Sequence, residues 1–142
     1  MRAVVLKAFG YPSNATVEEF PDPVPGPKDI LIQIQAVAAN FVDLLVIGGK
    51  YQFLPELPFV PGKAATGIVA TTGANVDKFK VGDRVLAMSE QGGYAQFLSI
   101  DQSQVYKIPD SLSFVDASSM SLVYDTAWFA MFERGRLRKG ET

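Results

Sequence analysis

Any chemistry in this chain of 142 residues has to work without a thiol or an imidazole, because the sequence contains no cysteine and no histidine. The missing cysteine removes disulfides, thiolate nucleophiles and thiolate metal sites. The missing histidine removes the commonest metal ligand and the usual base at neutral pH. Serine triads and ordinary zinc sites therefore cannot be built from these residues alone. Because no run of Asp and Glu has the loop spacing of a hard-cation site, we expect no metal.

The composition is that of a soluble globular domain. The chain is 48% hydrophobic and 20% charged, with a net charge of −2, and its length is enough for one domain with a real core. Thirteen basic residues face fifteen acidic ones, and the one basic cluster, at residues 134–139, reads as a solvated helix end, so we expect no nucleic-acid partner. No apolar run approaches the ~20 residues that span a bilayer. With no signal-peptide pattern at the N-terminus, we expect a cytoplasmic protein with no membrane partner.

Turn signals divide most of the chain into short strands. Gly82-Asp83 and Gly92-Gly93 each lie between apolar runs, where glycine accepts a positive φ and aspartate can bond its own backbone. Spacing alone favours an ordinary β-meander in which the strands on either side of Gly92-Gly93 are joined by a short connection. About seven such strands suggest a barrel or a sandwich. The expected strands cover residues 2–7, 16–20, 30–37, 67–72, 84–88, 94–100 and 104–108.

Two segments have helical character. Residues 40–47 favour a short helix with Asn40 as its N-cap, ended by Gly48-Gly49. Ser113 followed by Asp116 resembles a capping box, and residues 114–134 carry apolar side chains near helical spacing until Gly135. The chain therefore changes from mainly β to helical at about residue 113.

The order of several short motifs resembles a known family. Pro58-Phe59-Val60-Pro61-Gly62, Gly67-Ile68-Val69, Lys80-Val81-Gly82-Asp83-Arg84-Val85, Gly93-Tyr94-Ala95, Thr126-Ala127-Trp128 and Lys139-Gly140-Glu141-Thr142 follow one another as in the medium-chain dehydrogenase/reductase superfamily. Within it, the chain is similar to the zeta-crystallin-like quinone oxidoreductases. The resemblance covers essentially the whole chain.

The resemblance implies a mainly β fold with helices, a GroES-like β-barrel. Residues 1–112 would form the substrate domain, and residues 113–142 a helical segment leading to a Rossmann domain that begins just past Thr142 in the family. The sequence contains no G-x-G-x-x-G segment, so we expect a fragment that lacks the nucleotide-binding part. NADPH is the cofactor expected of the full-length family, and we expect this chain alone to bind none tightly.

Position by position, the resemblance points to the zinc-free branch. Zinc-dependent relatives carry cysteine at the place of Asn40, a histidine-glutamate pair at Lys63 and Ala64, and a further cysteine near Leu122. Without a Lewis acid, oxidation of simple alcohols is disfavoured. A quinone or an α,β-unsaturated carbonyl needs less help, since hydride addition places charge on an oxygen that already delocalises it, and a hydrogen-bond donor suffices there.

Asn40 is the expected catalytic residue and also a cofactor contact, while its helix-capping role remains an equal alternative. Tyr51 and Lys63 are expected to bind substrate; the alternatives are a half-buried loop tyrosine and a surface lysine. Asp43 lies at a family position near the same helix, but we favour a solvated helix residue there. Since family tyrosine and arginine positions near residues 45 and 47 are apolar here, the acceptor is not expected to bind as in the best-known quinone reductases.

Tyr124 and Thr126 are the other expected cofactor contacts, with plain core as the alternative for Tyr124. The function that follows is a substrate domain for metal-free reduction of a small quinone or enone by NADPH, inactive on its own. The alternative is a non-enzymatic GroES-like interaction module, which a seven-fold ring in solution would favour. We also expect self-association, as a homodimer or otherwise, or else a large exposed patch around Trp128, Phe129 and Phe132.

Overall fold

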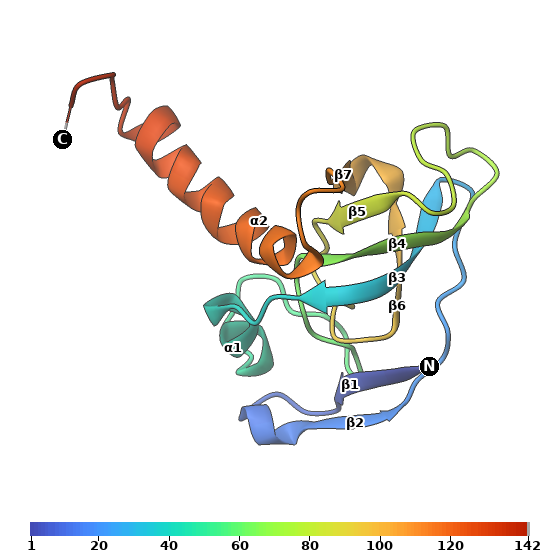
Figure 1. The fold of residues 1–142 in the computed structure, drawn as a ribbon. Coiled ribbons are helices and arrows are strands. Elements are labelled where there is room, and N and C mark those ends of the chain that lie inside the picture. The colour runs from blue at the N-terminus through green and yellow to red at the C-terminus, as the bar shows by residue number, and fades with distance from the viewer. Residues whose placement is uncertain (142) are drawn as a thin grey trace.

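The computed structural model describes residues 1–141, and Thr142, at the end of the expected connection to a further domain, lies outside the described residues. The molecule is mainly β, as expected (Figure 1). Its strands are β1 (Arg2–Leu6), β2 (Ala15–Glu19), β3 (Asp29–Val37), β4 (Ala65–Thr72), β5 (Arg84–Ala87), β6 (Phe97–Asp101) and β7 (Val105–Lys107). Its helices are α1 (Phe41–Ile47), α2 (Phe114–Trp128), the short turns η1 (Pro12–Asn14) and η2 (Gln102–Gln104), and the π-helical η3 (Phe129–Arg134).

Five of the strands form one antiparallel sheet in the order β6-β3-β4-β5-β7. The expected alternation in β3 is confirmed, because Ile30 and Ile32 are fully buried in the main core cluster with Val69 of β4 and Val85 of β5. Strands β1 and β2 pair separately, and single bridges from Ala3 to Ala95 and from Leu6 to Phe59 tie them to the rest. This arrangement is the expected GroES-like fold, and residues 1–141 contain no Rossmann domain.

The expectation of a simple meander around Gly92-Gly93 is wrong. β5 and β6 do not pair; β5 lies between β4 and β7, while β6 lies at the other edge beside β3. The connecting segment is held by other partners, since Gly92 N–H donates to Val60 O at 2.7 Å and Gly93 N–H donates to Gly62 O at 2.9 Å. With these bonds the chain crosses to the opposite edge of the sheet, where β6 pairs with β3. The local turn signals therefore do not decide which strands pair.

The C-terminal helical segment leaves the β body. Ser113 is the N-cap of α2, since its side chain accepts a hydrogen bond from Asp116 N–H at 3.0 Å. The expected start of this helix at Ser113 is therefore confirmed. The helix continues into η3 and ends at Gly135, as expected. Figure 1 shows that only the first turns of α2 lie against the sheet and that the rest projects outward. Within residues 1–141, no helix is both long enough and apolar enough to cross a bilayer.

Candidate functional site

Asn40 lies at the N-terminus of α1, as its expected capping role requires. Its backbone is extended, with φ −111° and ψ 156°, and it forms a capping box with Asp43, whose carboxylate accepts Asn40 N–H at 2.8 Å. The side-chain NH2 is only loosely engaged, because its nitrogen lies 3.5 Å from Ala38 O. The capping role and a donor role at a ligand are therefore compatible in this residue.

Asp43 is not the solvated helix residue that the sequence favoured. Only 4% of it is exposed, and its Oδ2 atom accepts hydrogen bonds from both Asn40 N–H and Tyr94 Oη–H, each at 2.8 Å. A buried carboxylate is tolerated when donors of this kind replace water. The donor from Tyr94 comes from a position 51 residues further along the chain, which no helical periodicity can indicate.

Tyr94 is the site residue that sequence reasoning missed. In the sequence it belongs to Gly93-Tyr94-Ala95 after a turn, and an aromatic residue beside glycine is the one signal that could indicate it. Its half-buried ring packs over Gly62, where a Cβ atom would lie 2.7 Å from the tyrosine. Burial first, and then the hydrogen bond to Asp43, raise the pKa of the Tyr94 phenol, so it remains a neutral donor at neutral pH.

Lys63 and Tyr51 lie together, but Lys63 is not a surface lysine. Only 5% of the residue is exposed, its Nζ atom lies 4.9 Å above the centre of the Tyr51 ring, and it forms an ion pair with Glu90. Tyr51 is half-buried in its loop. Backbone hydrogen bonds from residues 92–94 to residues 60–62 hold these two segments together next to Lys63.

The backbone around Lys63 is unusual. Gly62 has φ +99° and Ala64 has φ +62°, so left-handed residues stand on both sides of the lysine, and Ala64 adopts this conformation without being glycine. Ser89, beside Glu90, is buried, and its hydroxyl has no hydrogen-bond partner within residues 1–141. Lys63 therefore stands on a constrained segment of backbone.

The N-terminus of α1 and the middle of α2 border a cavity of about 340 Å³ that is open to solvent. Asn40 and Thr126 both line it, so two of the expected cofactor contacts are brought together. The hydroxyl of Thr126 donates to Leu122 O at 2.7 Å, which leaves its lone pairs open. Tyr124 does not line this cavity and is 62% exposed, so the alternative of a core tyrosine is wrong. The cavity is lined by Asn40, Phe41, Val42, Leu122, Val123 and Thr126.

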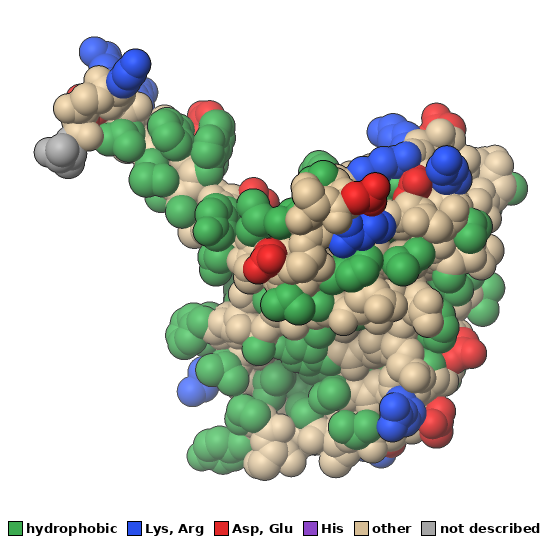
Figure 2. All heavy atoms as spheres, viewed as in Figure 1, with side chains coloured by type: hydrophobic (Ala, Val, Ile, Leu, Met, Phe, Trp, Pro, Cys, Tyr) green, Lys and Arg blue, Asp and Glu red, His purple; other side chains and the backbone are tan. Residues whose placement is uncertain are grey.

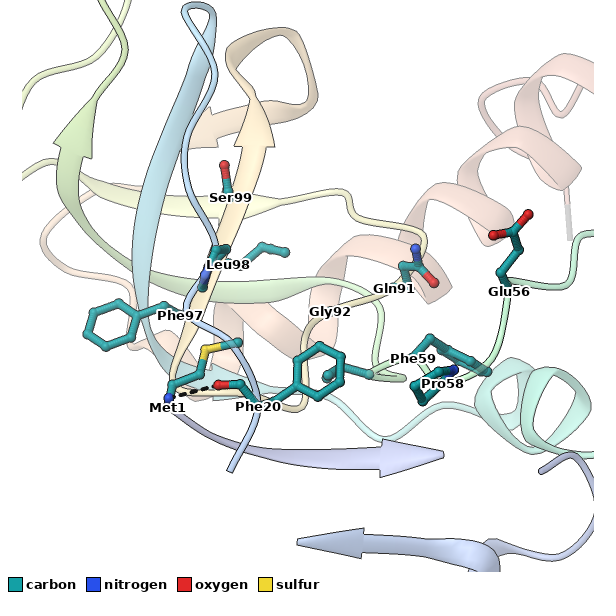
Figure 3. A pocket seen from close by; sticks show the side chains of 12 residues that line it. Met1, Phe20, Glu56, Pro58, Phe59, Gln91, Gly92, Phe97, Leu98 and Ser99 are labelled. Carbon is teal, nitrogen blue, oxygen red and sulfur yellow. Dashed lines mark hydrogen bonds between the residues drawn. The ribbon is translucent and has the colours of Figure 1, made fainter. Parts of the chain in front are cut away.

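A larger pocket of about 520 Å³ lies elsewhere, between the N-terminal segment and β6 (Figure 3). Aromatic and aliphatic side chains form most of its wall, including Phe20, Phe59 and Leu98. It is lined by none of the expected site residues, so its size does not make it the candidate site. The smaller cavity at Asn40 is the one that carries the expected chemistry.

Lys63 and Tyr51 do not line the cavity at Asn40, so the expected site residues form two groups: an amide and a hydroxyl at the cavity, and a cation against a tyrosine ring on the neighbouring loop. Within residues 1–141, no three side chains of Asp or Glu come together as a metal site would require. Asn40 and Leu122 line one cavity and supply an amide and an alkyl group. Tyr94 connects the Asn40 side to the Lys63 side, since it touches both Asp43 and Gly62.

Comparisons with known proteins identify the family and the fold. Residues 26–110 match the model of the alcohol dehydrogenase GroES-like domain. The chain is 38% identical over 142 residues to the rat protein named quinone oxidoreductase-like protein 2. The aligned region covers 99% of this chain and 40% of that protein.

Solved structures superpose closely on the chain. The human synaptic vesicle membrane protein VAT-1 homolog-like protein matches with a TM-score of 0.94 at 36% identity, over 99% of this chain and 45% of that one. The quinone oxidoreductase of Escherichia coli, solved with NADPH, matches with a TM-score of 0.88 at 27% identity, over 97% of this chain and 42% of that one. The chain thus spans less than half the length of these relatives.

Proposed function

This chain belongs to the alcohol dehydrogenase GroES-like domain family, within the zeta-crystallin-like branch of the medium-chain dehydrogenases/reductases, and we propose that it is the substrate domain of an NADPH-dependent quinone or enone oxidoreductase. In this proposal residues 1–112 bind the acceptor, and residues 113–142 lead to a dinucleotide-binding domain. The names of the relatives support an oxidoreductase; the choice of NADPH and of a quinone or enone is our extension.

The observation that carries the proposal is the position of Asn40. Its loosely held NH2 group belongs to a residue that lines the same cavity as Thr126, and its backbone is fixed by Asp43. A rigidly supported amide donor beside an apolar cavity is suited to a flat, conjugated carbonyl compound or to a nicotinamide ring. The cavity walls are mostly alkyl and aromatic groups, which fit the faces of such rings.

The chemistry needs little from the protein beyond orientation. When bound, NADPH supplies a hydride, and its addition to a conjugated carbon leaves negative charge on the carbonyl oxygen of the acceptor. The amide of Asn40 stabilises that oxygen by a hydrogen bond, and the ammonium of Lys63 adds positive potential from the neighbouring loop. Tyr51 borders the acceptor, and the ammonium of Lys63 lies over the face of its ring. This division of roles works without a metal ion in the site.

The remaining contacts to the cofactor follow from the same cavity. Asn40 and Thr126 would hold the nicotinamide half, and Tyr124, which is exposed on the outward face of α2, would meet the part of the cofactor that extends beyond the cavity. The sequence has no glycine-rich phosphate cradle, so we propose that this chain alone is inactive. We further propose a cytoplasmic protein that binds neither nucleic acid nor membranes, consistent with its net charge of −2.

A chimeric enzyme tests the proposal. Residues 1–142 replace the corresponding N-terminal part of mouse quinone oxidoreductase, a relative 35% identical over 144 residues, and NADPH oxidation is followed with 1,4-benzoquinone. We expect turnover by the chimera and none by the chain alone. Asn40→Ala should lower kcat about 100-fold, because one donor to a developing oxyanion is lost.

Asn75→Ala is the matched control, since Asn75 is exposed on a turn and should leave kcat unchanged. A well-folded chimera without turnover would contradict the proposed reaction. Turnover by the chain alone would contradict the need for a second domain, and full activity of Asn40→Ala would remove Asn40 from its role.

A further inference from the structure

We propose that Tyr94 is a positioning residue that acts on the acceptor through Asp43 and Asn40. The inference deepens the proposed function and rests on it for the part played by Asn40. The relevant feature is a relay of two hydrogen bonds that meet at one atom. Tyr94 Oη donates to Asp43 Oδ2 at 2.8 Å, and the same oxygen accepts Asn40 N–H at 2.8 Å.

Burial makes this relay rigid. Asp43 is almost fully buried, so water cannot easily replace either donor, and hydrogen bonds to a charged acceptor are stronger than neutral ones. Because the backbone N–H of Asn40 is hydrogen-bonded to Asp43, the direction of its Cα–Cβ bond is fixed. The side-chain amide can then reach only a limited set of positions. The carboxylate in turn is oriented by the phenol, because Tyr94 supplies its only tertiary donor among residues 1–141.

Tyr94 itself is anchored on two sides. Its backbone N–H donates to Pro61 O at 2.9 Å, and its carbonyl accepts Val4 N–H of β1 at 2.8 Å. Its ring lies over Gly62, the residue just before Lys63. One tyrosine therefore fixes the loop that carries the lysine with its ring, and fixes the asparagine with its hydroxyl. It sets the spacing between the amide donor and the cation.

Removal of the hydroxyl alone separates these two effects. Tyr94→Phe keeps the ring over Gly62 but leaves Asp43 with one donor fewer. A donor amide that is free to reorient gives fewer productive encounters with the acceptor oxygen, and errors of position of about 1 Å are costly in catalysis. We expect Tyr94→Phe to lower kcat of the chimera about tenfold.

A double-mutant cycle distinguishes positioning from a general structural role. If Tyr94 acts through Asn40, Tyr94→Phe has no further effect once Asn40 is alanine, and the double variant equals Asn40→Ala alone in kcat. If the two losses multiply instead, Tyr94 does not act through Asn40 and the inference is overturned.

Hydrogen exchange on the 142-residue chain provides a test that needs no activity. We expect the Asn40 backbone N–H to exchange about tenfold faster in Tyr94→Phe, while amides of β3 and β4 keep their wild-type rates. Tyr106→Phe, on the exposed face of β7, is the control and should change nothing at Asn40. An unchanged Asn40 rate in folded Tyr94→Phe would refute the relay.

If Tyr94→Phe does not fold, Tyr94→Leu tests the same relay, because it keeps an apolar side chain over Gly62 and removes the hydroxyl. Faster exchange at Asn40 in that variant supports the relay, and an unchanged rate refutes it. An inactive wild-type chimera would reject the proposed function, and the exchange rates would still decide whether Tyr94 holds Asn40. The two failures are therefore distinguishable.

Discussion

At the residue scale, the site depends on how two buried charges are satisfied. Asp43 is satisfied by two hydrogen-bond donors, whereas Lys63 is satisfied by the ion pair with Glu90 and by the ring of Tyr51. The partner of Lys63 is itself exposed, so an acceptor oxygen can compete with Glu90 for the ammonium, which has three donors. Asp43 has no such exposed partner, and its role is to hold other groups in place.

Tyr94 should make the stability of the chain depend on alkaline pH. Burial and the bond to Asp43 raise the pKa of its phenol in the folded state, while in the unfolded chain it ionises near pH 10. The contribution of this phenol to the free energy of unfolding is therefore fully present below about pH 10. It decreases as the pH rises from there toward the folded-state pKa.

Urea unfolding between about pH 9 and pH 12 measures this dependence. We expect the midpoint to fall less steeply for Tyr94→Phe than for wild type, whatever the stability of the variant at neutral pH. Tyr11→Phe, whose ring is exposed, should keep the wild-type slope. Identical slopes for wild type and Tyr94→Phe would show that the phenol is not shielded in the folded chain.

At the element scale, the segment from Val60 to Ala64 matters more than the strands beside it. It joins no named strand, yet it contacts residues 92–94 through three backbone hydrogen bonds and carries Lys63. Its conformation depends on Gly62, which is left-handed and lies directly under Tyr94. A side chain at this position would meet both the backbone nitrogen and the ring of the tyrosine.

Two glycine substitutions distinguish the cost of a steric contact with Tyr94 from the cost of a positive φ. Gly62→Ala should cost at least about 2 kcal/mol of unfolding free energy, because a positive φ is combined with a Cβ contact at 2.7 Å. Gly82→Ala should cost only about 1 kcal/mol, since Gly82 has φ +91° but no atom within 4 Å of the added Cβ among the residues that the structure describes.

Chemical denaturation of the two variants gives the comparison. Equal costs would mean that the ring of Tyr94 yields freely, and that the loop bearing Lys63 is not held by it.

At the scale of the whole molecule, the β body is well packed, whereas the C-terminal helical segment exposes many apolar side chains. The sheet and α1 enclose the core clusters, whereas α2 and η3 present apolar side chains to solvent, including Trp128 at 55% exposure (Figure 2). Trp128 and Phe132 pack against each other, with ring centres 5.6 Å apart, but cover little of one another. Apolar side chains exposed in this number form a patch, and contact with a further surface would remove that patch from water.

This surface should make the isolated chain associate with itself. We expect a sedimentation or size-exclusion profile that shifts with concentration, because exposed apolar area favours contact between copies. The combined variant Trp128→Gln and Phe132→Gln should remain monomeric over the same range. Tyr11→Gln, which removes an exposed aromatic ring outside this helix, should behave as wild type. A wild-type chain that stays monomeric at every concentration would contradict the prediction.

The sequence by itself determined the features that depend on neighbouring residues. Alternation placed Ile30 and Ile32 in the core, capping chemistry placed the starts of α1 and α2 at Asn40 and Ser113, and glycine ended the C-terminal helical segment. The order of short motifs led to the family, which the match over residues 26–110 confirms. These signals lie within a few residues of what they predict, so no tertiary contact is needed to read them.

Only the tertiary structure decided which distant segments meet. It separated β5 from β6, buried Asp43 and Lys63, and brought Tyr94 to the site. The bond from Tyr94 to Asp43 spans 51 positions, and the ion pair of Lys63 with Glu90 spans 27. A residue's own neighbours report whether it can form a strand or a cap, but its burial and its partners depend on how the whole sheet closes. The contacts of the candidate site therefore depend on the tertiary structure, whereas its helices and strands depend mainly on local sequence.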